Sequence, residues 1–237
     1  METEIKTFQS VADMLRFIDN NHKFCTTLPE DDAYYSIRRK WYGVASYQKA
    51  KELLKYGYKA DVNQELNVPI FNTTGEKKVN TIGIVGYAPH VPNAISGLPL
   101  CMRTKRKIET RNKVVDLYFN ATFNADVSTS TIKEKGERMI RLIKEHESKG
   151  VRVNLYLVAS ATDFKDHQAT IVVKFKDAKH PLNVSRLYYP LMHPSYLRVF
   201  MFKVWNRMKC HWSDTQYYVT HNIASILNID GVKKILI

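Results

Sequence analysis

Three oxygen-bearing side chains stand at alternate positions in the segment Asp126-Val127-Ser128-Thr129-Ser130. A carboxylate and two hydroxyls at this spacing suit a hard divalent cation such as Mg²⁺, with water or a partner's oxygen completing the coordination shell. Ser, Thr and Asp are also the residues that a helix N-terminus favours, because their oxygens accept hydrogen bonds from free backbone N–H groups. Asp126, Ser128 and Ser130 are therefore candidate metal ligands, with helix capping as the alternative, and no other cofactor is expected.

Two further segments combine positive charge with the features of a nucleic-acid surface. Basic side chains can pair with phosphates, and interleaved aromatic rings can stack on exposed bases. The candidate contacts are Arg38, Arg39, Lys40 and Trp41 in the first segment and Arg103, Lys105, Arg106, Lys107 and Arg111 in the second. The alternative for the first segment, which continues to Lys59, is a solvated helix face whose aromatic rings point into the core.

The whole chain is strongly basic. Its 237 residues include 36 Lys and Arg against 23 Asp and Glu, a formal net charge of +13 at pH 7. Such a surface attracts polyanions, of which nucleic acid is the commonest. A hydrophobic content of 44% is typical of a globular protein and excludes a mostly disordered one. We therefore expect nucleic acid or an acidic protein as the partner.

The cysteines and the apolar segments bear on the compartment. Cys25, Cys101 and Cys210 are far apart and odd in number, which indicates reduced thiols in a reducing compartment. The first residues lack the apolar stretch of a signal peptide, and no run approaches the roughly 20 apolar residues that span a membrane. We therefore expect a cytoplasmic protein that does not bind a membrane.

Catalytic motifs are incomplete in this sequence. The pairs His193-Pro194 and Cys210-His211, with His221 beyond, match no spacing of a metal site or a nucleophilic site. The segment Gly83-Ile84-Val85-Gly86 lacks the third glycine and the Lys-Ser ending of a phosphate-binding loop. The sequence thus favours a binding protein over an enzyme.

The N-terminal part, residues 1–113, is expected to be an α+β elaboration. Apolar residues at helical spacing predict a helix over 8–18 with Ser10 as its cap, and a second helix from Ser46 to a C-terminal Gly57. Short strands are expected at 62–71 and 80–87. Three prolines between 87 and 99 exclude a regular helix or a central strand, so an ordered surface loop is expected there.

Residues 114–237 show the clearest pattern and are expected to form the core. A strand over 114–123, a helix over 131–148 and a strand over 151–159 predict a βαβ unit with parallel strands. Further strands are expected at 170–175 and 233–237, and a helix at 194–208. The predicted fold class is α/β, with a three-layer Rossmann-like sheet.

The Asp126 segment lies between the first strand and the helix of this unit. There it resembles the metal-ion-dependent adhesion site of von Willebrand factor A-like domains. The resemblance implies a metal-dependent protein-interaction domain with Asp126, Ser128 and Ser130 as the first ligands. The pattern also needs a later threonine and a later aspartate, for which the options are Thr162 or Thr215 and Asp230.

A second resemblance rests on several short signatures. They are Trp41-Tyr42-Gly43, the residues Ala50, Leu53 and Gly57, the segment Gly97-Leu98-Pro99 with Met102, the helix and strand from Gly136 to Leu157, and His193-Pro194 with Arg198. Their order is similar to that in an uncharacterised family of tailed-bacteriophage proteins, over residues 41 to about 205. The resemblance implies a phage protein, in the host-cell cytoplasm or the virion, and no particular activity. With the charge, it favours a non-enzymatic accessory protein that contacts nucleic acid or an acidic partner.

Overall fold

The computed structural model of the chain describes residues 2–21, 35, 37–58, 76–109, 113–124, 126–162, 167–208, 218–219, 223–229 and 234–236. The chain divides into two compact units, one of Met1–Ile70 with Val114–Ile237 and the other of Phe71–Lys113. We call them the core unit and the hairpin unit. The expected boundary after residue 113 coincides with the end of the hairpin unit. Residues 1–70, however, belong with the C-terminal half of the chain.

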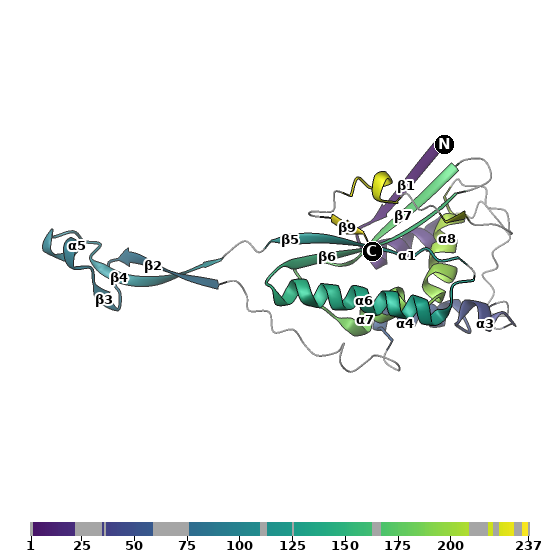
Figure 1. Cartoon of the computed structure of the whole chain (residues 1–237), viewed down its shortest axis with the longest axis horizontal. Coiled ribbons are helices and arrows are strands. Elements are labelled where there is room, and N and C mark those ends of the chain that lie inside the picture. The colour runs from purple at the N-terminus through teal and green to yellow at the C-terminus, as the bar shows by residue number, and fades with distance from the viewer. Residues whose placement is uncertain are drawn as a thin grey trace. The chain divides into compact units, whose positions relative to one another are not determined.

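One mixed sheet organises the core unit (Figure 1). Its strands are β1 (Glu2–Phe8), β5 (Val114–Asn120), β6 (Arg152–Thr162), β7 (His167–Lys176) and β9 (Lys234–Leu236), in the order β1-β7-β6-β5-β9, and β8 (Tyr218–Val219) pairs with β6. β5 is parallel to β6 and β9, β7 is antiparallel to β6, and β1 is parallel to β7. Because β1 extends this sheet, the N-terminal residues share the core unit.

The βαβ unit expected from the sequence is present. β5 and β6 are parallel neighbours, and α6 (Thr129–Ser148) connects them. The expected apolar face of α6 is buried, at Ile132, Met139, Ile140 and Ile143. The parallel strands and their crossover helix confirm the α/β class.

Two predicted helices near the N-terminus are confirmed together with their caps. α1 (Val11–Asn20) begins after Ser10, whose Oγ accepts the N–H of Asp13 at 3.1 Å. α4 (Tyr47–Tyr56) begins after Ser46, whose Oγ accepts the N–H of Lys49 at 3.0 Å. Each serine satisfies a backbone donor that the first helical turn leaves free. Between these helices lies the short α3 (Arg39–Tyr42).

The C-terminal helices include one that the sequence pattern did not predict. α7 (Val184–Met192) carries Pro190 inside it, and a proline usually ends a helix because it removes a backbone donor. The helix expected at 194–208 forms as the π-helix η2 (Tyr196–Met201) followed by α8 (Phe202–Trp205). α9 (Ile223–Ile226) follows. None of the described helices is long and apolar enough to cross a membrane.

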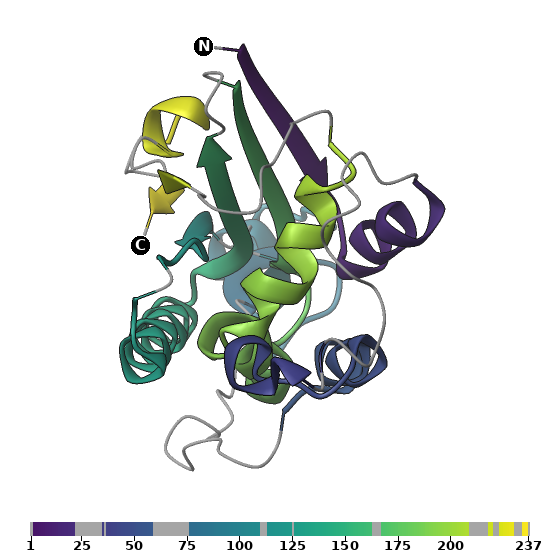
Figure 2. The same ribbon diagram turned by 90° about the vertical axis from the view of Figure 1, so that its right-hand side faces the viewer.

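Helices cover the two faces of the core sheet unequally (Figure 1, Figure 2). α4, α6 and α7 lie along one face, where the strand residues Leu117, Leu155 and Ile171 are fully buried, and α9 lies on the other face. On that second face Ile223 packs with Val158 and Val172 in a small cluster. The large core therefore lies between the sheet and the layer of α6 and α7.

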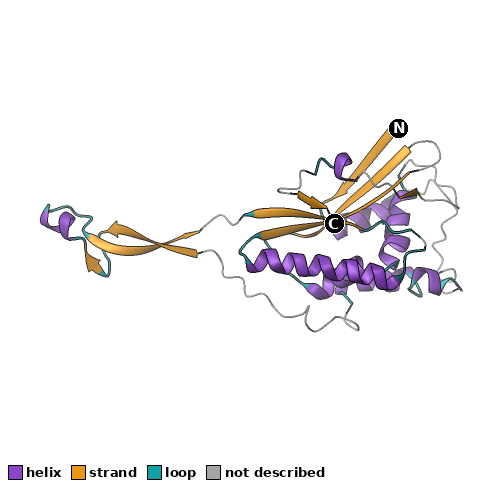
Figure 3. Ribbon diagram, viewed as in Figure 1, coloured by secondary structure: helices purple, strands orange, loops and turns teal. Residues whose placement is uncertain are grey.

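The hairpin unit has an antiparallel sheet of its own, drawn in orange in Figure 3. It contains β2 (Glu76–Gly83), β3 (Ala88–Pro89), α5 (Val91–Ile95) and β4 (Met102–Glu109), with β4 between β2 and β3. The expectation of a loop over 87–99 is wrong in part, because α5 holds Pro92 in its first turn, where a missing N–H breaks no helical hydrogen bond. β2 overlaps the strand expected at 80–87, whereas the strand expected at 62–71 falls outside the described residues.

Candidate nucleic-acid interface

The second basic segment of the sequence forms the central strand of the hairpin unit. In β4, Arg103, Lys105 and Arg106 are all exposed. Alternate residues of a strand face the same side, so Arg103 and Lys105 share one face and Arg106 lies on the other. Lys107 follows in the same strand, opposite Lys78 of β2. The structure therefore presents cations on both faces of this ribbon.

Positive charge is concentrated in the sequence of the hairpin unit. Its 43 residues, 71–113, contain eight Lys and Arg residues against two Glu residues, which gives +6 of the chain's +13. Arg111, the last candidate contact of this segment, contributes to that charge but lies outside the described residues. Nearly half of the excess charge thus falls in less than a fifth of the chain.

A close backbone crossing places an aromatic side chain beside these cations. A Cβ atom on Gly86 would lie 2.1 Å from the carbonyl oxygen of Arg103, so only glycine fits there. The next residue, Tyr87, donates its backbone N–H to the same carbonyl at 2.9 Å. Tyr87 is 60% exposed, and the Lys105 ammonium lies 5.5 Å from its ring centroid, within cation–π range. Sequence reasoning missed Tyr87 because the neighbouring prolines indicated an irregular loop.

An open hollow of about 280 Å³ lies in the hairpin unit, lined by Asn80, Thr81, Ile82, Tyr87, His90 and Arg103. The lining combines an aromatic ring, an aliphatic side chain, hydrogen-bonding groups and a guanidinium. The Nδ1 atom of His90 is buried and has no hydrogen-bond partner within the described ranges.

The turn and the short helix of the hairpin unit expose aliphatic side chains. Ile84, Val85, Val91, Ile95 and Leu98 are each at least half exposed. A group of exposed apolar residues marks a contact surface more often than a solvated one. The hairpin unit thus combines basic strands with an apolar turn.

The first basic segment belongs to the core unit, whereas the second belongs to the hairpin unit. Arg38, Arg39 and Lys40 are exposed, but Trp41 is only 37% exposed. The Arg198 guanidinium lies 3.8 Å from the centroid of the Trp41 ring and donates a hydrogen bond to the Trp41 carbonyl. One face of the Trp41 ring is therefore already occupied by a cation of the chain itself.

The tyrosines that follow Trp41 divide between the core and the surface. Tyr42 is buried, and Tyr58 is partly buried with its ring stacked on Tyr188 at a centroid distance of 5.6 Å. Tyr56, in contrast, is 65% exposed, with the Lys55 ammonium 5.2 Å from its ring centroid. The first segment therefore offers fewer stacking groups than its sequence indicates.

Several signature residues of the bacteriophage resemblance meet around α7. A Cβ atom on Gly43 would lie 2.7 Å from the ring of His193. Cβ atoms on Gly57 and Gly136 would lie 2.5 and 2.6 Å from backbone carbonyl oxygens of α7. These glycines let α3, α4 and α6 approach α7 closely, and the left-handed backbones of Gly43 (φ +72°) and Gly57 (φ +85°) favour glycine as well.

His193 ends α7, and its ring is held by the residues beside it. Its Nδ1 accepts the backbone N–H of Ser195 at 3.2 Å and lies 2.6 Å from the Ser195 Oγ, which donates to the Tyr189 hydroxyl at 2.8 Å. Burial, and secondarily the charge of Arg198, lower the pKa of His193 to about 4, so the ring is neutral at pH 7. Since Ser195 is fully buried, its hydroxyl is inaccessible to a substrate and the cluster is structural.

At the Asp126 segment the structure shows a helix cap. Ser128 Oγ accepts the N–H of Thr131 at 3.2 Å at the start of α6 and lies 2.8 Å from the hydroxyls of Ser130 and Thr131. Asp126 is exposed in the preceding turn. Capping thus accounts for Ser128, and a Mg²⁺ site at Asp126, Ser128 and Ser130 stays a prediction. Of the residues expected to complete that site, Thr162 ends β6, whereas Thr215 and Asp230 lie outside the described residues.

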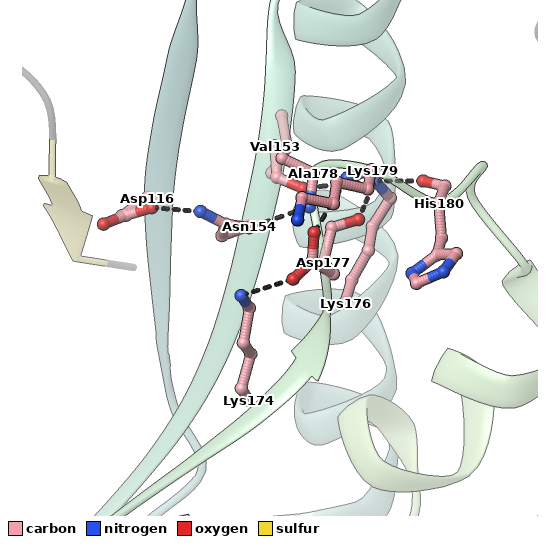
Figure 4. Close-up of polar contacts among 9 residues, drawn as sticks. All are labelled: Asp116, Val153, Asn154, Lys174, Lys176, Asp177, Ala178, Lys179 and His180. Carbon is pink, nitrogen blue, oxygen red and sulfur yellow. Dashed lines mark hydrogen bonds and ion pairs between the residues drawn. The ribbon is translucent and has the colours of Figure 1, made fainter. Parts of the chain in front are cut away.

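A polar network fastens the turn after β7 to the core sheet (Figure 4). The Asn154 amide donates to Asp116 of β5 at 2.7 Å and accepts a backbone N–H of that turn at 2.7 Å. The Lys174 ammonium donates to Asp177 at 2.7 Å and, together with the N–H of Lys179, lowers the pKa of the Asp177 carboxyl to about 2. These side chains pair with one another, which indicates a structural network rather than a ligand site.

A buried ion pair joins β7 to α6. Lys176 Nζ is 2.5 Å from Glu147 Oε1 and donates to two backbone carbonyls at 3.1 and 3.0 Å. Both side chains are almost fully buried. The register of β6 and β7 shifts between Leu155 and Tyr156, and this bulge turns Lys176 toward the helix layer although Lys174 faces the other side of the sheet.

A family model described as Domain of unknown function (DUF7192) matches residues 2–227. No curated protein and no solved structure matches the chain. The family match spans the core unit and the hairpin unit alike, so the inserted hairpin is part of what the family model describes.

Proposed function

We propose that this chain, which belongs to the DUF7192 family, binds nucleic acid through the strands of its hairpin unit, as a binding protein rather than an enzyme. The observation that carries the proposal is the exposure of Arg103, Lys105 and Arg106 on the central strand of a unit whose sequence has a net charge of +6. A surface with this excess of cations attracts the phosphate backbone of DNA or RNA.

The shape of the hairpin unit supports the same function. Apart from the two residues of β3, the sheet is a ribbon of β2 and β4. A two-stranded β-ribbon fits the major groove of a duplex, and a basic surface can also follow a single strand. Arg103 and Lys105 stand two residues apart, which separates them by roughly 7 Å along the strand. At that separation the two cations can contact different phosphates. Each such contact releases counterions, so binding should weaken as salt rises.

The first basic segment is the weaker candidate surface. Arg198 already occupies one face of the Trp41 ring, which leaves less of that ring for a base. The exposed cations Arg38, Arg39 and Lys40 can still add phosphate contacts. We therefore expect this segment to make a smaller contribution to affinity than the hairpin strands.

The test is a salt series of binding to labelled single-stranded and duplex oligonucleotides, measured by fluorescence anisotropy. Replacing Arg103, Lys105 and Arg106 together by Gln should weaken binding by about tenfold or more near 0.1 M salt. The slope of log K against log salt should fall by about 2 to 3, because three phosphate contacts are removed.

The matched control neutralises Arg138, Arg141 and Lys149, which are exposed on or directly after α6 in the core unit. It removes the same three charges from another surface and should change affinity by less than about threefold. Equal losses in the two variants would mean that only net charge matters and would contradict a hairpin interface. If the wild-type chain binds no oligonucleotide at low salt, an acidic protein becomes the partner to seek.

A second candidate function is a von Willebrand A-like, metal-dependent interaction domain within a Rossmann-like core. The parallel strands β5 and β6 and the position of the Asp126 turn between β5 and α6 favour it. In that case MgCl₂ should raise the melting temperature of the wild-type chain but not that of Asp126→Ala. The absence of any magnesium effect would leave the segment with its capping role. A phage or host nucleic acid as the natural ligand likewise stays a prediction from the bacteriophage resemblance.

A further inference from the structure

We propose that the hollow of the hairpin unit binds one unpaired base of a nucleic-acid strand, stacked on Tyr87. This inference rests on the proposed function and narrows its ligand to a strand whose bases are exposed. The hollow contains groups suited to each part of a nucleotide: a flat ring for the base, polar groups for its edge and a guanidinium for the phosphate.

Tyr87 supplies the stacking surface. Its ring is largely exposed, while its backbone is fixed by the hydrogen bond from its N–H to the Arg103 carbonyl. The contact that only glycine permits at Gly86 further restrains the chain at this point. A tyrosine on a restrained backbone has only two side-chain torsions to fix when a base stacks on it, so the loss of conformational entropy is small. Stacking tolerates every base, because each has a flat aromatic face.

The polar lining of the hollow suits the edge of a base. The Asn80 side chain carries both a donor and an acceptor. His90 also lines the hollow, and the Tyr87 ring and Arg103 lie beside these polar groups. In a duplex the Watson–Crick edges are paired and the faces are stacked, so only an unpaired base can offer both to this hollow.

The cations of the hollow suit the phosphate attached to that base. Arg103 lines the hollow, and the Lys105 ammonium lies 5.5 Å from the centroid of the Tyr87 ring. Because this cation is farther from the ring than Arg198 is from Trp41, at 3.8 Å, it leaves more of the ring open to a base. Arg103 and Lys105 share one face of β4, so a nucleotide stacked on Tyr87 would have its phosphate within reach of one of them. An acidic peptide would use these cations, but its carboxylates would leave the flat Tyr87 ring without a matching group. The combined lining therefore favours a nucleotide over a carboxylate ligand.

The experiment measures binding of the full chain to a labelled oligothymidylate of about 12 nucleotides and to its duplex with oligodeoxyadenylate. Tyr87→Ala should weaken binding of the single strand about 5- to 100-fold and that of the duplex by less than about twofold. Tyr87→Phe keeps the ring and should retain affinity within about threefold. The comparison is Tyr56→Ala, because Tyr56 has similar exposure, 65%, and a lysine 5.2 Å from its ring. Since Tyr56 belongs to the weaker first basic segment, its loss should weaken binding less than Tyr87→Ala does.

A cross-linking measurement keeps the test valid if Tyr87→Ala perturbs the hairpin. Ultraviolet cross-linking of a 4-thiothymidine-containing strand to the wild-type chain should modify the peptide that contains Tyr87. Cross-links confined to other peptides would overturn the proposal, as would equal effects of Tyr87→Ala and Tyr56→Ala.

Two further comparisons distinguish failure of the base site from failure of the proposed function, and a nucleic-acid strand from a free nucleotide as the ligand. If neutralising Arg103, Lys105 and Arg106 weakens binding while Tyr87→Ala does not, the hairpin surface stands and the base site is wrong. If thymidine monophosphate competes as well as the oligonucleotide at equal nucleotide concentration, the site is for a free nucleotide and not for a strand. If no oligonucleotide binds at all, the proposed function itself fails.

Discussion

Lys176 and Glu147 place two opposite charges in the core, where each depends on the other. Their attraction offsets the loss of hydration only while both are present, 2.5 Å apart and almost fully buried. Glu147→Gln would leave the Lys176 ammonium buried without a counter-charge. We expect the free energy of unfolding in urea to fall by about 3–5 kcal/mol.

Two further variants test whether the loss of stability comes from burying an unpaired charge or only from losing an ion pair. The double replacement of Lys176 by Met and Glu147 by Leu should recover most of the loss, because apolar side chains need no counter-charge. Lys149 and Glu145 form an exposed pair at the same distance, 2.5 Å, so Glu145→Gln should change stability by less than about 1 kcal/mol. Equal losses in Glu147→Gln and Glu145→Gln would contradict the role assigned to burial.

His193 gives the core unit a dependence on pH. Its pKa is about 4 in the folded chain, below the ordinary value of 6.5, chiefly because the ring is buried. Between pH 6.5 and 4 the unfolded chain therefore binds a proton that the folded chain does not, and stability falls as pH falls. The loss should reach about 3 kcal/mol below pH 4, measured by urea unfolding across the pH range.

The variant that isolates this effect is His193→Asn. Its side-chain oxygen can accept the Ser195 N–H as Nδ1 does, but it does not titrate. The other histidines are common to both chains, so the difference between wild type and variant reports His193 alone. A wild-type curve parallel to that of His193→Asn between pH 6.5 and 4 would show that the buried ring is not neutral in the folded state.

At the scale of elements, the approach of α6 to α7 depends on one glycine. A Cβ atom on Gly136 would lie 2.5 Å from the Met192 side chain and 2.6 Å from the Leu191 carbonyl oxygen. Alanine in a helix interior normally stabilises by about 0.5–1 kcal/mol relative to glycine. Here we expect Gly136→Ala to lower the free energy of unfolding by about 1–3 kcal/mol, because the helices must separate. The sign of the change, measured by thermal unfolding, is the test.

Gly150 provides the comparison for this prediction. It follows α6 with φ of +76°, and a Cβ atom there would meet nothing within 4 Å. Gly150→Ala should therefore lose only about 1–2 kcal/mol from its left-handed backbone, without any change in helix packing. If Gly136→Ala is as stable as the wild type or more so, the helix contact is not tight.

Sequence patterns predicted those helices and strands whose local signals, such as caps and apolar spacing, agree with the tertiary structure. The serine caps of α1 and α4 and the β5-α6-β6 unit followed from caps and periodicity. β1 was missed because an edge strand of alternating polar residues has a weak pattern, and α7 was missed because Pro190 interrupts its pattern. The inward turn of Lys176 depends on a register shift between two strands, which no local pattern records.

Of the residues in the candidate interface, the sequence predicted only the basic ones. Charge alone selected Arg103, Lys105 and Arg106, because clustered basic residues are visible in any sequence. Tyr87 and His90 join them through strand pairing and the contact at Gly86, which bring together residues distant in the chain. The pairing of β2 with β4 had to be known before the hollow could be recognised.

At the scale of the molecule, the hairpin unit is an insertion in the sequence of the core unit. Antiparallel pairing sets Glu76 opposite Glu109, so the two ends of the ribbon lie about 5 Å apart. An insertion whose ends meet can be removed without stretching the chain that carries it. The binding role proposed for the hairpin unit can therefore be tested separately from the stability of the core unit.

Replacing residues 77–108 by a Gly-Ser linker of about four residues tests this division. The described strands of the core sheet and the helices packed on it all lie outside the removed segment. The variant should therefore unfold cooperatively, with a melting temperature within about 5 °C of the wild type. Oligonucleotide binding should fall at least as far as in the triple Gln variant, since the same cations and Tyr87 are removed together. Loss of the unfolding transition would make the hairpin part of the folding unit, and retained binding would move the interface to Arg38, Arg39 and Lys40 in the core.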